Sequence, residues 1–237
     1  TPIAEQIICA VDLGINTDAV CSIMKADGTI LARKFIDFTS DKDRMIHAMN
    51  RTRRKQSKYG PKSTRGLWAY VKRLNEDRAK KISAAIVEFA SQHSVDAIVM
   101  EHLDFKGCKK RGSKAQRLSM WNHGIIREKV EQNAHLIGIR VATICAWKTS
   151  ALAFDGSGNV TRDNNNHALA TFTTGKQYNC DLSASYNIGA RYFIRELLKS
   201  LPATEESRVK AKVPDAGRRT SCTLSTLRAL VKELSAA

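Results

Sequence analysis

The stretch IICAVDLGINTDAV, residues 7–20, opens with five apolar residues that lead directly into Asp12. A short apolar run containing Ile and Val is typical of a buried strand, and here an acid stands where the strand ends. Two further β-like runs follow at 18–26 and 29–38, and the Asp27-Gly28 pair between them predicts a tight hairpin. The first 38 residues therefore predict a meander of three strands, the first of which ends in a carboxylate.

Helical and strand-like patterns alternate after this meander. A basic stretch at residues 44–65 holds eight Lys or Arg and no acid, and predicts a helical arm that breaks at KYGPKSTRG. Apolar residues at helical spacing then predict a long amphipathic helix: they are Leu67, Val71, Leu74, Ile82, Ile86 and Phe89. The apolar run at 95–100 predicts a buried strand that ends in Glu101. A further helix from Leu118 and a strand at 139–145 complete an α/β pattern.

The last third of the chain changes character twice. Residues 147–180 are polar and contain the turns FDGSG and RDNNN, so we expect an insertion that carries a hairpin. A strong helical pattern begins at Asp181 and continues to Lys199, before Pro202. Residues 203–220 are polar and basic and are expected to be mobile, before a short final helix. We therefore divide the chain into a domain at 1–202, with insertions at 44–93 and 147–180, and a basic tail at 203–237.

The composition points to a polyanionic partner. The formal net charge is +16 and the pI is about 9.8, and nucleic acid is the commonest ligand of so basic a chain. No apolar run is long enough to span a bilayer, and the first residues do not resemble a secretion signal. We expect no membrane partner and a cytoplasmic location. The absence of an initiator Met suggests that an N-terminal portion is missing.

Three acids are placed where a solvated surface charge is not expected. Asp12 and Glu101 each end an apolar strand, and Asp181 opens a helix. A carboxylate beside a buried strand costs several kcal/mol unless it is paired or binds a metal ion. Hard oxygen ligands without a His or Cys cluster favour Mg²⁺ or Mn²⁺ over zinc, and two such ions can promote phosphodiester hydrolysis. Each acid taken alone also fits a turn or cap residue; their order along the chain is that of an RNase H-like fold.

The sequence resembles the transposon-encoded TnpB nucleases and the related type V CRISPR effectors, which carry a RuvC-type nuclease domain. AVDLGINTDAV at 10–20 is similar to the first RuvC motif of the family, and AIVMEHLDFKG at 97–107 to the second. CDLSASYNIGARY at 180–192 resembles the third motif, D-x-N-A-A-x-N-I. The positions that align within the third motif are Asp181, Ala184, Asn187 and Ile188. All three motifs occur in the family's order and span nearly the whole chain.

This resemblance implies a fold, a reaction and partners. The implied fold is a mixed central sheet flanked by helices, and the implied activity is two-metal-ion hydrolysis of DNA. Asp12 would bridge both Mg²⁺ or Mn²⁺ ions, with Glu101 and Asp181 each on one side. Cleavage would leave 5′-phosphate and 3′-hydroxyl ends. In the family, a guide RNA pairs with a single-stranded or unwound DNA target, and N-terminal domains of the same effector read a short flanking motif.

The sequence departs from the family pattern at two places. The family's zinc ribbon between the second and third motifs needs two C-x-x-C pairs, and the six cysteines of this chain form none. We therefore expect no structural zinc, and interpret 147–180 as a degenerate ribbon-like hairpin, which Lys148, Thr149 and Ser150 introduce. Ser183 replaces the asparagine of the third motif, which is not a metal ligand, so we expect activity to survive.

Basic side chains near the acids are candidate contacts to nucleic acid. These candidates are Arg51, Arg53, Arg54, Lys55, Lys58, Lys109, Lys110, Arg111, Lys114 and Lys148. A merely solvated basic face is the alternative. Three aromatics, Trp68, Tyr70 and Trp121, are candidates for base stacking, although core packing is the more frequent role.

Other polar residues are assigned structural roles first. Strand alternation turns His102 away from Glu101, and Asp18, Asp104 and Asp163 fit turns or loops better than they fit auxiliary ligation.

Two other functions remain open from the sequence. One is a nuclease-inactive domain that binds guide RNA or DNA. This alternative does not explain the presence of three acids whose burial destabilises the fold. The other is a stand-alone RNase H or Holliday-junction resolvase on the same fold. The basic insertion before Glu101 and the extent of the resemblance favour the RNA-guided nuclease.

Overall fold

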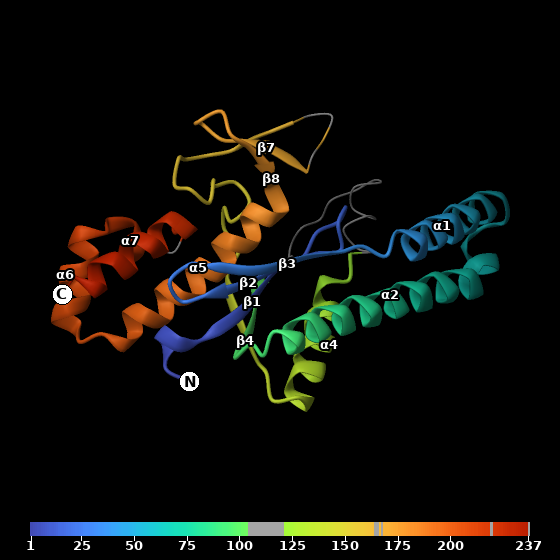
Figure 1. Ribbon diagram of the computed structural model, residues 1–237. Coiled ribbons are helices and arrows are strands. Elements are labelled where there is room, and N and C mark those ends of the chain that lie inside the picture. Colours follow the sequence, from blue (N-terminus) through green and yellow to red (C-terminus); the bar gives the residue numbers. More distant parts are fainter. Residues whose placement is uncertain (104–120, 164–165, 167, 219, 237) are drawn as a thin grey trace.

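A five-stranded mixed sheet forms the centre of the chain (Figure 1). The computed structural model describes residues 1–103, 121–163, 166, 168–218 and 220–236. The strands, in the spatial order β3-β2-β1-β4-β5, are β1 (Ile7–Asp12), β2 (Ala19–Lys25), β3 (Ile30–Ile36), β4 (Ala97–His102) and β5 (Arg140–Cys145). β1, β2 and β3 form an antiparallel meander, and β4 and β5 run parallel to β1 on its other side. This topology confirms the predicted RNase H-like fold.

The predicted hairpin between β2 and β3 is confirmed. Gly28 adopts a φ of 81°, which a residue without Cβ tolerates in a tight turn. The Asp27 side chain accepts a hydrogen bond from the Thr29 backbone N–H at 2.8 Å, as is usual for an Asp that closes a turn. Turn chemistry and the β-rich flanks therefore agree, and they fix the register that places Asp12 opposite Val20.

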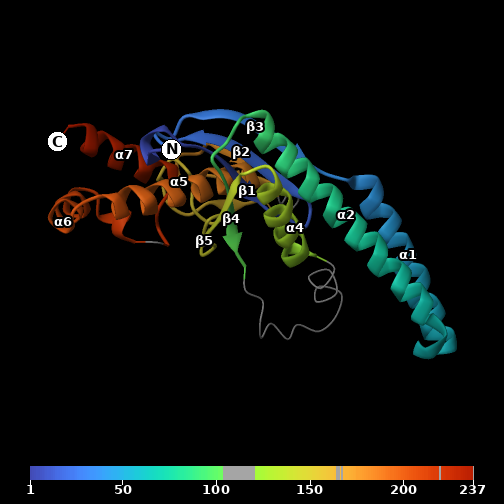
Figure 2. The ribbon, with the colours of Figure 1, turned by 90° about the horizontal axis from the view of Figure 1, so that it is seen from below.

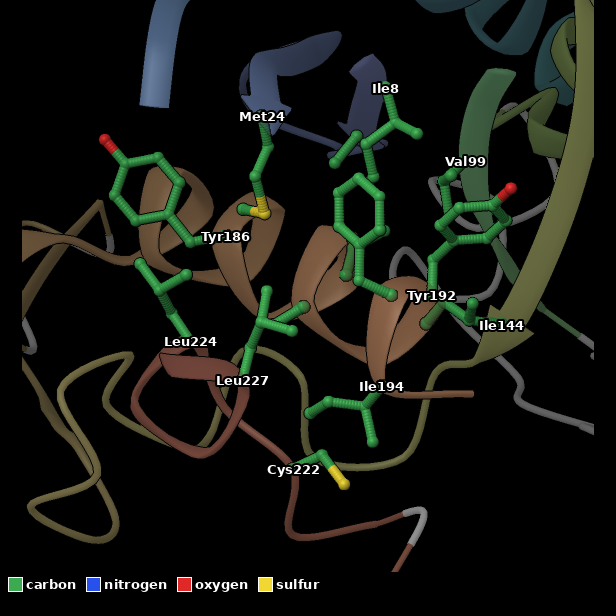
Figure 3. Close-up of a cluster of buried hydrophobic side chains, with 14 of the residues drawn as sticks. Ile8, Met24, Val99, Ile144, Tyr186, Tyr192, Ile194, Cys222, Leu224 and Leu227 are labelled. Carbon is green, nitrogen blue, oxygen red and sulfur yellow. The ribbon is translucent and has the colours of Figure 1, made fainter. Parts of the chain in front are cut away.

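Each face of the sheet is covered by its own helices, because strand residues alternate between the faces. Ile8, Ala10 and Val99 pack against α5 (Cys180–Ser200), in the cluster that Figure 3 shows. Cys9, Val11, Ile98 and Met100 point the other way. They pack against α2 (Arg65–Gln92) and α4 (His123–Leu136). The strands are thus buried on both faces, as their nearly continuous apolar sequences predict.

A pair of helices forms an arm that projects beyond the sheet (Figures 1 and 2). α1 (Thr39–Tyr59) ends at Gly60, whose φ of 81° breaks the helix, and the short 3₁₀ turn η2 (Pro61–Thr64) leads into α2. Met45, Met49 and Val71 give this arm a small core of its own. The expected helical arm, its break and the long amphipathic helix are confirmed.

The segment between β5 and α5 folds into a small second sheet. Its strands are β6 (Thr161–Arg162), β7 (Leu169–Thr171) and β8 (Gln177–Asn179), all antiparallel. Ala153, Ala170, Phe172 and Cys180 pack beneath it. The β7–β8 pair is the hairpin that the sequence predicted for this region.

The described residues after 202 are largely helical, whereas the sequence predicted a mobile stretch at 203–220. They include α6 (Ala203–Lys212) and the 3₁₀ turn η3 (Pro214–Gly217) before α7 (Leu224–Ser235). Leu224, Leu227 and Leu230 are fully buried against α5, in the same cluster as the sheet. The predicted final helix is confirmed, and its burial anchors the polar segment before it. At the other end, η1 (Ile3–Glu5) precedes β1.

Candidate functional site

Asp12 and Glu101 lie at the same level on neighbouring strands. Val11 pairs with Met100 in the parallel β1–β4 ladder, so the next residue of each strand is one of these acids. The preceding residues on the same face, Ala10 and Val99, pack against α5. Because side chains alternate along a strand, both carboxylates also point to the α5 side of the sheet.

Asp181 comes to this face from the first turn of α5. The helix begins at Cys180, and Asn179 caps it by accepting a hydrogen bond from the Leu182 N–H at 2.8 Å. The Cys180 thiol donates to Asp181 Oδ1 at 3.3 Å. Asp181 is half-buried and is held at a helix N-terminus, which favours a negative charge.

The three acids act on one another electrostatically. Asp12 is only 9% exposed, and burial raises its pKa well above the ordinary value, with further increases from the negative charges of Glu101 and Asp181. Burial also raises the pKa of Glu101, against the opposing effects of a hydrogen bond from Thr149 and the charge of Arg191. Arg162 on β6 is the cation that acts on Asp12 and lowers its pKa. The fold thus concentrates negative charge at the carboxyl ends of β1 and β4.

Thr149 is a direct partner of Glu101. Its hydroxyl donates to Glu101 Oε1, although 48 residues separate the two in sequence. Thr149 is buried in the turn that follows β5, and Asn187 of α5 holds that turn by donating to the carbonyls of Thr149 and Leu152 at 3.0 and 2.9 Å. Asn187, an aligned residue of the third motif, therefore fixes the support of the glutamate.

The carboxylates are not gathered into a compact ligand set. Within the described ranges, no three His, Cys, Asp or Glu side chains are arranged closely enough to hold a metal ion. Glu101 and Asp181 nevertheless act electrostatically on Asp12 and raise its pKa. Their donor chemistry, carboxylate oxygen only, suits a hard divalent cation such as Mg²⁺ or Mn²⁺.

The acids proposed as auxiliary ligands have other partners. Asp18 is buried, pairs with Arg78 and accepts a hydrogen bond from the Phe38 N–H at 2.9 Å. Asp163 accepts from the Asn166 N–H at 2.8 Å in a loop. Asp104 lies outside the described residues. His102 is the last residue of β4 and pairs with Cys145 of β5. Because it follows Glu101 directly, strand alternation turns its side chain away from the acids.

The candidate nucleic-acid contacts fall in three places. Four residues of α1 are exposed on the arm: Arg51, Arg54, Lys55 and Lys58, whereas Arg53 is half-buried. Lys148 is exposed beside Thr149. Lys109, Lys110, Arg111 and Lys114 lie outside the described residues.

Two of the three aromatic candidates for base stacking form hydrogen bonds between α1 and α2. Trp68 is half-buried and donates to Gln56 Oε1 at 2.7 Å, and the Tyr70 hydroxyl accepts from Arg44 at 3.1 Å. Both bonds join α1 to α2. Trp121 is also half-buried. Trp147, which the sequence analysis did not single out, is 64% exposed.

Comparison with known proteins extends these observations. No family model matches the sequence, and no curated protein does. The solved structures of similar fold include a Cas12f1–sgRNA–target DNA complex (TM-score 0.58, 18% identity), a CRISPR-Cas12f ternary complex (0.56, 16%) and an AacC2c1–sgRNA binary complex (0.57, 10%). The chain has the fold of the RuvC-like domain of Cas12-type effectors. Between 77% and 80% of this chain is covered, and it spans 49%, 39% and 39% of those three proteins.

Proposed function

We propose that this chain is the core of a divalent-metal-dependent endonuclease that hydrolyses DNA phosphodiester bonds. The observation that supports this proposal is the placement of Asp12 and Glu101 at the ends of neighbouring strands, on the face of the sheet that α5 covers with Asp181 in its first turn. Asp12 is buried there, and its pKa is raised by burial and by the charges of Glu101 and Asp181. A buried acid that is repelled by two others destabilises a fold unless a cation joins them, which makes the cluster a functional candidate.

Each residue of the site has a distinct task in this mechanism. Two Mg²⁺ or Mn²⁺ ions, when bound, would supply a nucleophilic water and stabilise the charge that develops on the phosphate. Asp12, Glu101 and Asp181 are the residues that would hold these ions. Thr149 fixes one oxygen of Glu101, so the other remains available for ligation. Arg162, the cation that acts on Asp12, can attract the phosphate to the site.

The proposed partners are a DNA target strand and a guide RNA, within a longer effector that also has N-terminal domains. The Cas12f1 structure contains an sgRNA and target DNA, and the AacC2c1 structure contains an sgRNA. The other Cas12f structure is a ternary complex. The net charge of +16 suits such polyanions. None of the helices in the described ranges has the length and apolar character that a membrane crossing requires. We propose a cytoplasmic setting.

The direct test is to incubate the chain with labelled single-stranded DNA and Mg²⁺ or Mn²⁺, with and without a chelator. We expect cleavage that the chelator abolishes and that leaves 5′-phosphate ends. DNA binding without cleavage at any metal concentration would favour the nuclease-inactive alternative. Equal cleavage of a Holliday junction would favour the resolvase alternative.

Removing the hydroxyl of Thr149 should weaken the site without unfolding the chain. We expect Thr149→Val to lower the cleavage rate or the apparent Mg²⁺ affinity by about 10- to 100-fold, because groups that orient a metal ligand have effects of this size. Thr149→Ser keeps the hydroxyl and should retain most of the activity. Titration of the cleavage rate with Mg²⁺ checks both variants, and equal curves for Val and Ser would refute the role of the hydroxyl.

The basic arm should contribute salt-dependent affinity for nucleic acid. Replacing Arg51, Arg54 and Lys55 with Ala should weaken binding of single-stranded DNA. It should also reduce the slope of log K against log salt by about 0.7 for each phosphate that the arm no longer neutralises. Lys129→Ala on α4 serves as a control. Fluorescence anisotropy across a salt series measures the slope, and an unchanged slope would show that the arm is a solvated face.

A further inference from the structure

A large cavity lies beside the acidic site, on the other side of the turn that carries Thr149. It has a volume of about 920 Å³ and lies between β5, α5 and the segment around η3. Its walls include Ile144, Ile194 and Leu198, and Trp147 stands at its edge. A pocket of this size with apolar walls and several polar groups is large enough for a small organic ligand or a segment of a polymer.

The lining of the cavity is strongly cationic. Five basic residues line it, namely Lys148, Arg191, Arg195, Lys199 and Lys210, and Glu206 is the single acid in the described lining. Glu206 pairs with Lys210, and Glu196 nearby is shared by Arg195 and Lys199 at 2.7 and 3.6 Å. The cations therefore outnumber the acids, and the cavity is complementary to an anion.

Arg191 builds the cavity and keeps its charge. Its guanidinium donates to the carbonyls of Cys145 and Trp147 at 2.8 Å each, and to those of Thr220 and Cys222 at 3.1 and 3.2 Å. Within the described residues, all four acceptors are neutral carbonyls, so none of these bonds cancels the positive charge. The side chain joins the end of β5 to the C-terminal segment, two walls that lie far apart in sequence.

One turn connects the cavity with the acids. Trp147 and Lys148 line the cavity, and Thr149, the next residue, contacts Glu101. Lys148 adopts a φ of 60°, a conformation that costs a residue with a Cβ about 1 kcal/mol or more and that is concentrated at functional sites. Arg191 holds the Trp147 carbonyl while the ring stays exposed, so this indole is fixed at its backbone and open for stacking.

We propose that this cavity binds a short stretch of the single DNA strand that the acidic site cuts, with a base on Trp147 and phosphates on Lys148, Arg195 and Lys199. The choice of DNA rests on the proposed function. The position of the cavity supports this choice. Lys148 lines the cavity and the next residue, Thr149, contacts Glu101, so a DNA strand that leaves the cavity past Lys148 arrives at the acids. An exposed aromatic beside cations is the usual platform for a single-stranded nucleic acid.

Binding is tested in the presence of a chelator, so that the result does not depend on cleavage. The probe is a short single-stranded dT oligonucleotide, read by tryptophan fluorescence and by anisotropy of an attached dye. We expect the oligonucleotide to quench the Trp147 emission. Trp147→Phe should keep the affinity within about twofold and remove this part of the quenching, whereas Trp147→Ala should weaken binding about tenfold through lost stacking.

A charge-matched pair of variants locates the phosphates. Lys199→Glu and Lys232→Glu change the net charge equally, but Lys232 lies on α7, outside the cavity lining. We expect the first variant to weaken binding several-fold more than the second. Equal affinities of Trp147→Ala and the unaltered chain, or equal effects of the two Glu variants, would overturn the proposal. A rU oligonucleotide that binds more tightly and depends more strongly on Trp147 would overturn the choice of DNA.

The two proposals fail in distinguishable ways. If the chain binds dT through Trp147 but does not cleave with any metal ion, the cavity stands and the nuclease proposal fails. If the chain cleaves DNA, and Trp147→Ala binds and cuts as well as the unaltered chain, the nuclease proposal stands and the cavity assignment fails.

Discussion

Asp12→Asn is expected to lower metal-dependent DNA cleavage by about a thousandfold or more while leaving the affinity for single-stranded DNA nearly unchanged. The carboxylate is the central acid of the cluster, and Asn supplies one neutral oxygen in its place. The basic residues that attract the phosphate backbone lie on other elements, so binding should not depend on Asp12. Cleavage assays and anisotropy on the same preparation measure the two effects.

The same variant should be more stable than the unaltered chain when no metal ion is bound. The pKa of Asp12 in the folded chain is raised by burial first and then by Glu101 and Asp181. Its protonated form therefore stabilises the fold, fully at a pH below the unfolded pKa, and this contribution is lost as the pH rises through the folded pKa. Asn remains neutral throughout, so its advantage in Tm should be greatest near neutral pH and should shrink toward acidic pH.

A matched control separates the site from general charge effects. Asp43→Asn removes one negative charge from an exposed position on α1. This control should change neither the cleavage rate nor the pH dependence of Tm appreciably. Unchanged cutting by Asp12→Asn would remove the acidic site from the mechanism, and a lower Tm in chelator at neutral pH would contradict the electrostatic account.

The second large effect is expected at the root of the arm. Arg78 of α2 and Asp18 form an ion pair in which Arg78 is 8% and Asp18 1% exposed. Asp18 also accepts a hydrogen bond from Phe38, the residue before α1. Arg78→Met leaves a buried carboxylate without its cation, and we expect it to lower the free energy of unfolding by about 3–5 kcal/mol. Urea denaturation measures the loss.

The double variant tests the cause. Asp18→Asn with Arg78→Met removes both charges and leaves a side chain that can still accept from Phe38, so we expect most of the lost stability to return. The exposed pair of Lys72 and Glu76 on the same helix provides the control, because Lys72→Met should change the stability by less than about 1 kcal/mol. A double variant no more stable than Arg78→Met would show that packing, and not the unpaired charge, causes the loss.

Local signals in the sequence were sufficient for the secondary structure that carries the site. The apolar run before Asp12, the Asp27-Gly28 turn and the helical spacing of Val71, Ile82 and Ile86 each act over a few residues. They predicted the meander, the long helix and the strand that ends in Glu101. The polar composition of 203–220 indicated neither α6 nor the burial of the following helix, α7, against α5.

Residue types and their order along the chain predicted the fold class and singled out the three acids as candidates, because local hydrophobic patterns indicate where strands end and helices begin. Only the tertiary structure decided what surrounds the acids. The bond from Thr149 to Glu101, the action of Arg162 on Asp12 and the four carbonyls on Arg191 join residues that lie tens of positions apart. No periodicity encodes such contacts, since they arise where chain segments meet in space. The same holds for the cavity that Trp147 lines, whose other walls come from α5 and the C-terminal segment.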